Sequence, residues 1–208
     1  MTTPLGAIEI GPRDGRRVTV ARSTAETDIT VTLGLDGSGH SAIDTGIGFY
    51  DHLLASLAHH GLFDLAIHAD GDLQVDEHHT VEDAALVLGA AFAEALGDRT
   101  GIARFGSSTV PMDESLATVA LDMGGRPYAV IDLPFRGQHA GGLPLQLVDH
   151  ALESFARTAG ATLHVTGTGR NDHHLAEAAF KALGRALRVA CEIDPRRDGV
   201  ASTKGTLE

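Results

Sequence analysis

The chain repeats part of its own sequence, and this repeat limits the possible folds more than any other feature. The segment Asp51–Ala58 recurs as Asp149–Ala156, with Asp, His, Leu, Ser and Ala in register. The motif His78-His79-x-x-Glu82 recurs as His173-His174-x-x-Glu177, and both copies continue into a Leu-Gly pair. The separations are 98 and 95 residues, and the motifs keep their order. The sequence therefore predicts two fused copies of one unit of about 95 residues.

Hydrophobic spacing predicts a similar plan for the two halves. In the first half we expect strands at residues 17–21, 29–35 and 62–69, and helices at 50–60 and 80–96. In the second half we expect strands at residues 116–122, 128–133 and 162–166, and helices at 147–158 and 175–191. Each half is then a β-β-α-β-α unit of the α+β class, and a pseudo-two-fold axis should relate the two halves.

We place the boundary between the halves after Gly97. Residues 1–97 form the first half-repeat and residues 98–208 the second, within one compact unit. The tail from Asp194 is rich in Gly, Pro and charged residues, so we expect it to be mobile until it contacts a ligand.

Composition excludes several classes of function. The net charge of −12 argues against nucleic-acid binding, which needs a basic surface. No apolar run reaches the ~20 residues of a membrane span, and no secretory signal is visible. The single cysteine rules out an internal disulfide, so we expect a cytoplasmic protein. The 12 histidines, in contrast, call for a chemical explanation.

The paired histidines predict two metal sites. His78 and Glu82 share a helix face because they are four residues apart, whereas His79 is turned by ~100° and is available to another ion. The repeat sorts the ligands into two sets, which are His78, Glu82, His174 and His150, and His173, Glu177, His79 and His52. Four protein ligands leave about two positions open on an ion that prefers six, such as Mn²⁺, and this is a catalytic layout.

A second group of residues is suited to an anion. Arg104 and Arg126 offer guanidinium groups to phosphate oxygens, and the run Ser202–Gly205 offers hydroxyls, an ammonium group and an approachable backbone. Taken alone, each of these residues is more often an ordinary surface residue.

A series of motifs along the chain resembles the imidazoleglycerol-phosphate dehydratase family. The resemblance runs from about Arg16 to Leu207. It is carried by Thr24-Ala25-Glu26-Thr27, Thr45–His52, Gly71-Asp72, His78–Asp83, Pro111–Glu114, Gly125-Arg126-Pro127, Asn171–His174, Phe180-Lys181-Ala182 and Ser202–Gly205. Ser56 departs from the Gln that is common in the family.

The resemblance implies an activity and an assembly. Members of the family convert imidazole glycerol phosphate to imidazole acetol phosphate in histidine biosynthesis, use manganese, and form 24-subunit shells with metal sites at subunit contacts. It also implies two Mn²⁺ ions per active site and a homo-oligomer. Carried over residue by residue, the implied metal ligands are His52, His78, His79, Glu82, His150, His173, His174 and Glu177. The implied substrate contacts are Glu26, Arg104, Arg126, Ser202 and Lys204.

The chemistry suggests why two ions suit this substrate. Cations on both ring nitrogens favour an imidazolate, whose charge assists loss of the neighbouring hydroxyl. Glu26 is our candidate for proton transfer, and Asp113 and Lys181 are weaker candidates. Two other functions fit the ligands alone: a two-metal hydrolase of a phosphorylated substrate, and a non-catalytic metal-binding shell protein. The product formed from imidazole glycerol phosphate distinguishes them.

Overall fold

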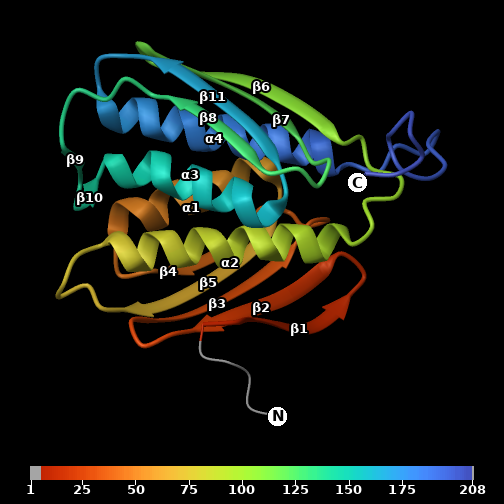
Figure 1. Cartoon of the computed structure of the whole chain (residues 1–208). Coiled ribbons are helices and arrows are strands. Elements are labelled where there is room, and N and C mark those ends of the chain that lie inside the picture. Colours follow the sequence, from red (N-terminus) through yellow and green to blue (C-terminus); the bar gives the residue numbers. More distant parts are fainter. Residues whose placement is uncertain (1–5, 208) are drawn as a thin grey trace.

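Four helices lie between two β-sheets (Figure 1). The computed structural model describes residues 6–207. The first sheet contains β1 (Ile8–Asp14), β2 (Arg17–Ser23), β3 (Thr27–Gly34), β4 (Ser41–Asp44) and β5 (Asp64–Gly71). The second contains β6 (Phe105–Met112), β7 (Ser115–Asp122), β8 (Tyr128–Asp132) and β11 (Thr162–Thr168). The helices are α1 (Gly48–Gly61), α2 (His78–Leu96), α3 (Gln146–Ala159) and α4 (Asp172–Cys191).

The two sheets share one topology. The strand order is β1-β2-β3-β5-β4 in the first sheet and β6-β7-β11-β8 in the second. In both, the first pairings are antiparallel, whereas β4 pairs with β5 and β8 pairs with β11 in parallel. The four strands β2, β3, β5 and β4 therefore match β6, β7, β11 and β8. The α+β class and the duplicated half are confirmed.

Each half contains more strands than its hydrophobic spacing predicts. Within the unit that the two halves share, the additional strand is β4 in the first half and β6 in the second, so the unit is β-β-β-α-β-α. β4 has only four residues and no buried side chain. β6 alternates in exposure, but its inward positions include Gly106 and Ser108 and an outward one is Phe105, so its sequence does not alternate between apolar and polar residues. The exposed edge strand β1 and the short hairpin β9 (His139–Ala140) and β10 (Leu143–Pro144) also lack this signal.

The two halves meet through their helices. α1 packs on α4, and α2 packs on α3, so each helix contacts the partner from the other half. Glycines allow the close approach. A methyl group at Gly184 would overlap the carbonyl oxygen of Leu57, and one at Gly89 would overlap that of Phe155. This exchange of partners is the arrangement that an approximate two-fold axis produces.

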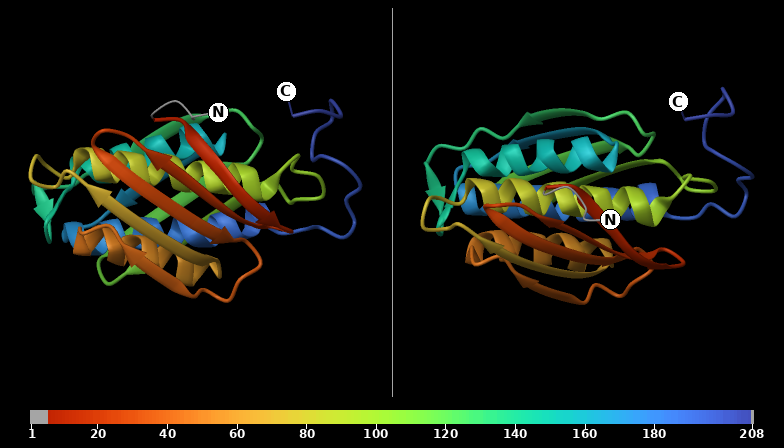
Figure 2. Two further views of the ribbon diagram at one scale, coloured as in Figure 1. Left: turned by 90° about the horizontal axis from the view of Figure 1, so that it is seen from below. Right: turned by 60° about the horizontal axis from the view of Figure 1, so that its bottom comes forward.

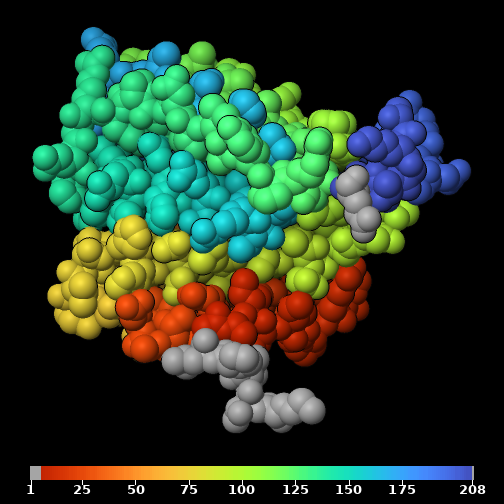
Figure 3. All heavy atoms as spheres, in the orientation of Figure 1, coloured from red at the N-terminus to blue at the C-terminus, as the bar shows by residue number. Residues whose placement is uncertain are grey.

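The helix starts place the histidines at one end of the molecule. Asn171 caps α4 by accepting hydrogen bonds from the backbone N–H groups of His173 and His174, and Asp76 accepts one from that of His78. The C-terminal segment follows α4 and projects from the opposite end, as Figures 2 and 3 show in deep blue. Within residues 6–207, the structure contains no helix of the length and hydrophobicity that crossing a bilayer requires.

Candidate metal centre

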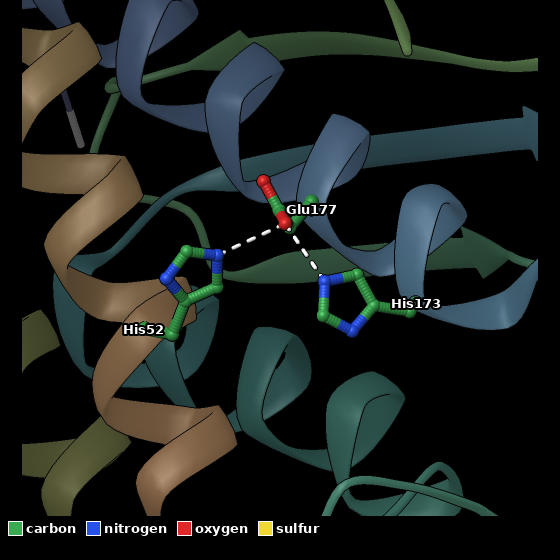
Figure 4. A group of neighbouring side chains, drawn as sticks. All are labelled: His52, His173 and Glu177. Atoms are coloured by element: carbon green, nitrogen blue, oxygen red, sulfur yellow. Dashed lines mark hydrogen bonds and ion pairs between the residues drawn. The ribbon is translucent and has the colours of Figure 1, made fainter. Parts of the chain in front are cut away.

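One cluster of metal-ligating side chains lies between α1 and α4. It consists of His52 from α1 with His173 and Glu177 from α4, and their ligand atoms all lie within 4.8 Å of one another (Figure 4). Oε1 of Glu177 is 2.9 Å from Nε2 of each histidine. The carboxylate is 7% exposed and the two rings about half exposed, so the cluster opens to the surface from a buried base.

A second cluster occupies the corresponding position between α2 and α3. His78 and Glu82 from α2 meet His150 from α3, again with all ligand atoms within 4.8 Å. Oε2 of Glu82 is 3.7 Å from Nε2 of His78 and 3.6 Å from that of His150. The two rings stack with their centroids 4.8 Å apart. Because each helix packs on a helix of the other half, the same His-His-Glu group forms twice.

Each carboxylate contacts its two imidazoles with one oxygen and a basic side chain with the other. Oε2 of Glu177 accepts a hydrogen bond from Nζ of Lys181 at 2.5 Å, and Oε1 of Glu82 lies 3.2 Å from Arg157. Burial alone would raise the pKa of Glu177, but the hydrogen bonds from Lys181, His52 and His173 outweigh burial and lower it to about 2. The carboxylate is therefore ionised at neutral pH, as a metal ligand must be.

The residues present fit a divalent cation. Two imidazoles and one carboxylate form a donor set that transition ions accept. Nε2 of His150 is buried and has no hydrogen-bond partner among residues 6–207. Buried polar atoms usually have a partner, and a metal ion would supply one for this nitrogen. Three protein ligands also leave positions open for further ligands.

His79 and His174 lie outside these two clusters, although the internal repeat predicts that each belongs to a set of four ligands. Nδ1 of His79 is 3.1 Å from Asp72, and Nδ1 of His174 is 3.0 Å from Glu114. The hydrogen bond to Asp72 is the main cause that raises the pKa of His79. Hydrogen bonds from His174 and then from the backbone of Asn171 and Arg170 hold the pKa of Glu114 well below its usual range. One chain thus brings together three members of each set.

Glu26 lies at the same end as the clusters. It is in the turn between β2 and β3, with Oε2 3.7 Å from Nδ1 of His79, and its side chain is 55% exposed. The turn is held by Thr24, whose hydroxyl accepts the backbone N–H groups of Glu26 and Thr27. Glu26 therefore presents a carboxylate to solvent beside the histidines.

The four candidates for phosphate binding lie together at the other end. Arg104 donates two hydrogen bonds to Asp122, at 2.6 and 2.8 Å, and one to the carbonyl of Ala201 at 2.6 Å. It thereby ties the backbone next to Ser202 to the body of the protein. Lys204 is exposed, and its backbone N–H donates to Oγ of Ser202 at 3.2 Å. Arg126 is exposed in the loop between β7 and β8.

The length of a helix separates the two groups. The histidines lie at the start of α4, and the tail begins where α4 ends, after 20 residues. At 1.5 Å per residue this is about 30 Å. Figure 1 shows the two ends on opposite sides of the molecule. A small substrate cannot span them within one chain.

Sequence reasoning did not assign roles to three residues of the site. Arg157, on α3, pairs with Glu82, and Asp72 and Glu114 hold the two remaining histidines. Asp72 and Glu114 occur in motifs of the family resemblance, but their partners are 7 and 60 residues away and are visible only in the folded chain.

Comparison with known proteins gives a consistent result. The sequence profile of imidazoleglycerol-phosphate dehydratase matches residues 45–187. The imidazoleglycerol-phosphate dehydratase of Methanoculleus marisnigri is 56% identical over 188 residues, which are 90% of this chain and 97% of that protein. That of Methanocella arvoryzae is 55% identical over 192 residues, 92% of this chain and all of that protein.

Solved structures agree. Imidazoleglycerol-phosphate dehydratase from Staphylococcus aureus superimposes with a TM-score of 0.77 at 32% identity, covering 85% of this chain and 98% of that one. IGPD from Pyrococcus furiosus gives 0.78 at 37% identity, covering 89% and 99%. The chain therefore belongs to the imidazoleglycerol-phosphate dehydratase family and is a dehydratase, that is, a hydro-lyase.

Proposed function

We propose that this protein removes water from imidazole glycerol phosphate to give imidazole acetol phosphate, a step of histidine biosynthesis, with a pair of Mn²⁺ ions at each active site. The observation that carries the proposal is the pair of His-His-Glu clusters, each with its ligand atoms within 4.8 Å, in a chain of this family. A substrate that contains an imidazole ring has two nitrogens, and two ions match them.

The eight metal ligands of the proposal are His52, His78, His79, Glu82, His150, His173, His174 and Glu177. The ions, when bound, supply positive charge that stabilises negative charge on the ring as the hydroxyl leaves. Lys181 and Arg157 hold the outer oxygens of Glu177 and Glu82, so the inner oxygens stay directed at the imidazoles.

Glu26 moves the proton in this proposal. The reaction breaks a C–H bond and the neighbouring C–OH bond, and the resulting enol becomes the ketone. An exposed carboxylate next to His79 is suited to accept the carbon-bound proton. Arg104, Arg126, Ser202 and Lys204 hold the phosphate and so orient the carbon chain toward Glu26.

The active site is formed between chains. Within one chain, the metal clusters and the phosphate-binding residues lie about 30 Å apart along α4. A bound substrate therefore contacts the metal cluster of one copy and the phosphate-binding residues of another. His79 and His174 complete ion sites in the same way. This requirement supports a homo-oligomer, and a closed 24-subunit shell satisfies it for every copy.

Turnover of imidazole glycerol phosphate tests the proposal. The purified protein is stripped with chelator, restored with Mn²⁺, and assayed for the ketone. We expect product only with metal. A different product would favour a two-metal hydrolase, and full metal occupancy without product would favour a non-catalytic shell protein. Either result would refute the dehydratase.

A further inference from the structure

The two histidines outside the clusters are each held at the same ring nitrogen. Nδ1 of His79 lies 3.1 and 3.2 Å from the carboxylate oxygens of Asp72, and Nδ1 of His174 lies 3.0 Å from Oε2 of Glu114. A carboxylate can only accept a hydrogen bond. The N–H of each neutral ring is therefore at Nδ1, and the lone pair is at Nε2.

We propose that Asp72 and Glu114 are positioning residues, which fix the tautomer and direction of His79 and His174 so that each ring offers Nε2 to a divalent cation held by another copy of the chain. The inference rests on the proposed function for the identity of the site. A carboxylate that accepts a hydrogen bond from the non-ligating nitrogen of a histidine also raises the basicity of the ring. It holds the ring in one orientation, so less conformational entropy is lost when a metal binds.

Glu114 is held in place for this task by contacts with the backbone and with Ser115. Its Oε1 accepts the backbone N–H groups of Arg170 and Asn171, at 3.1 and 2.7 Å, and the hydroxyl of Ser115 at 3.1 Å. Its other oxygen is left for His174. The turn between β6 and β7 is thus fastened to the start of α4, and the ring is fixed relative to the helix that carries His173 and Glu177.

Asp72 is fixed by a different route. It follows β5 directly, its backbone N–H donates to the carbonyl of Glu26 at 3.1 Å, and its side chain is 16% exposed. The end of β5 lies tightly against α2, because a methyl group at Gly71 would overlap the hydroxyl of Thr80. Asp72 follows the end of β5, and His79 lies in the first turn of α2. These two segments are in contact, which fixes the carboxylate relative to the ring.

The duplication explains why the two carboxylates come from different places. Glu114 stands immediately before β7, and Glu26 stands immediately before β3, the corresponding strand of the other sheet. Glu26 is the counterpart of Glu114, yet it is 3.7 Å from its histidine and 55% exposed, against 3.0 Å and 25% for Glu114. Asp72 has taken over the orienting contact in the first half, which leaves Glu26 available to a substrate.

Isosteric variants test the proposal. Asp72→Asn and Glu114→Gln keep the shape, and the glutamine keeps a carbonyl oxygen for the backbone of Arg170 and Asn171. In the glutamine variant, the amide N–H then faces Nδ1 of His174 and favours the tautomer with hydrogen on Nε2, whose Nε2 has no lone pair for a metal. In the asparagine variant, a neutral amide replaces the carboxylate beside Nδ1 of His79 and holds the tautomer less firmly. We expect Mn²⁺ affinity to fall about 10- to 100-fold, and raised Mn²⁺ to restore turnover. Asp70→Asn, an equal charge change at an exposed position of β5, should leave the affinity unchanged.

Two measurements keep the outcomes apart. Mn²⁺ affinity, measured by competition with a chelator, does not depend on turnover. Unchanged affinity in both variants would overturn the positioning role even if the wild type is an active dehydratase. Weakened affinity would support it even if the wild type made no ketone. If the variants do not fold, ¹⁵N spectra of the metal-free wild type decide, since hydrogen on Nε2 alone in the neutral rings of His79 and His174 would overturn the inference.

Discussion

Gly184 lies where α4 packs tightly on the backbone of α1, and replacing it with alanine tests how the fold supports the metal site. A methyl group there would overlap the carbonyl oxygen of Leu57 and lie 3.1 Å from the backbone nitrogen of Gly61. Both are backbone atoms, so the helices must move apart. Such overpacking costs about 1–3 kcal/mol, and the better helix propensity of alanine returns up to ~1 kcal/mol.

Because the overlapped atom is a backbone oxygen, we take the upper part of the overpacking range, about 2–3 kcal/mol. Less ~1 kcal/mol for helix propensity, Gly184→Ala should lower the free energy of unfolding by about 1–2 kcal/mol and the melting temperature by roughly 2–8 °C. The same helix pair carries His52, His173 and Glu177, so the Mn²⁺ affinity of that cluster should fall as well. Urea unfolding of the metal-free protein at one fixed protein concentration measures the stability, because the proposed assembly would make the stability depend on concentration.

Matched variants distinguish the effect of the helix–helix contact from the effect of replacing a glycine with alanine. Gly48→Ala adds a methyl group that meets no atom within 4 Å and should not destabilise the protein. Gly89→Ala places one against the carbonyl oxygen of Phe155 and 2.9 Å from the nitrogen of Ala159, so it should weaken α2 and α3 in the same way. A Gly184→Ala protein as stable as the Gly48→Ala control would refute the reasoning.

Three further predictions concern single side chains. Glu26→Gln should retain Mn²⁺ but lose most turnover, and near-normal turnover would remove Glu26 from proton transfer. Lys204→Met should raise the KM for the phosphorylated substrate without changing Mn²⁺ affinity, as steady-state kinetics and metal titration will show. Hydrogen bonds from the backbone of Ser38, and also of His40, lower the pKa of Asp64. Their stabilisation is complete above the unfolded pKa of about 4 and is lost as the pH falls through the lower folded value. Asp64→Asn should therefore flatten the acid side of a stability–pH curve, and an unchanged slope would contradict this.

The sequence predicts those parts of the fold that have a regular hydrophobic period. All four helices are found within three residues of their expected bounds, because their buried faces recur every three or four positions. β4 and β6 have no such pattern, since β4 is exposed and β6 contains Gly106 and Pro111. Their places in the sheets depend on pairing with β5 and β7, which a single sequence does not display.

The candidate site also contains some contacts that sequence spacing predicts and others that arise only when the chain folds. The i, i+4 spacing of His78 and Glu82 places them on one face, and the internal repeat links them to His150, which α3 brings beside them. Lys181 is four residues after Glu177, so helical spacing could have indicated their ion pair, although the sequence was interpreted only as offering Lys181 for proton transfer. The partnership of His174 with Glu114 joins residues 60 positions apart and arises from docking of the β6–β7 turn on α4.

Mixing two inactive variants tests most directly the claim that catalysis combines opposite ends of different chains. Glu177→Gln removes a cluster carboxylate, and Arg126→Ala removes a guanidinium group from the phosphate end. Each variant alone should be inactive. Co-expressed in one assembly with Mn²⁺, they should regain turnover of imidazole glycerol phosphate, because some sites combine an intact metal end with an intact phosphate end. No recovery in confirmed mixed assemblies would contradict the account.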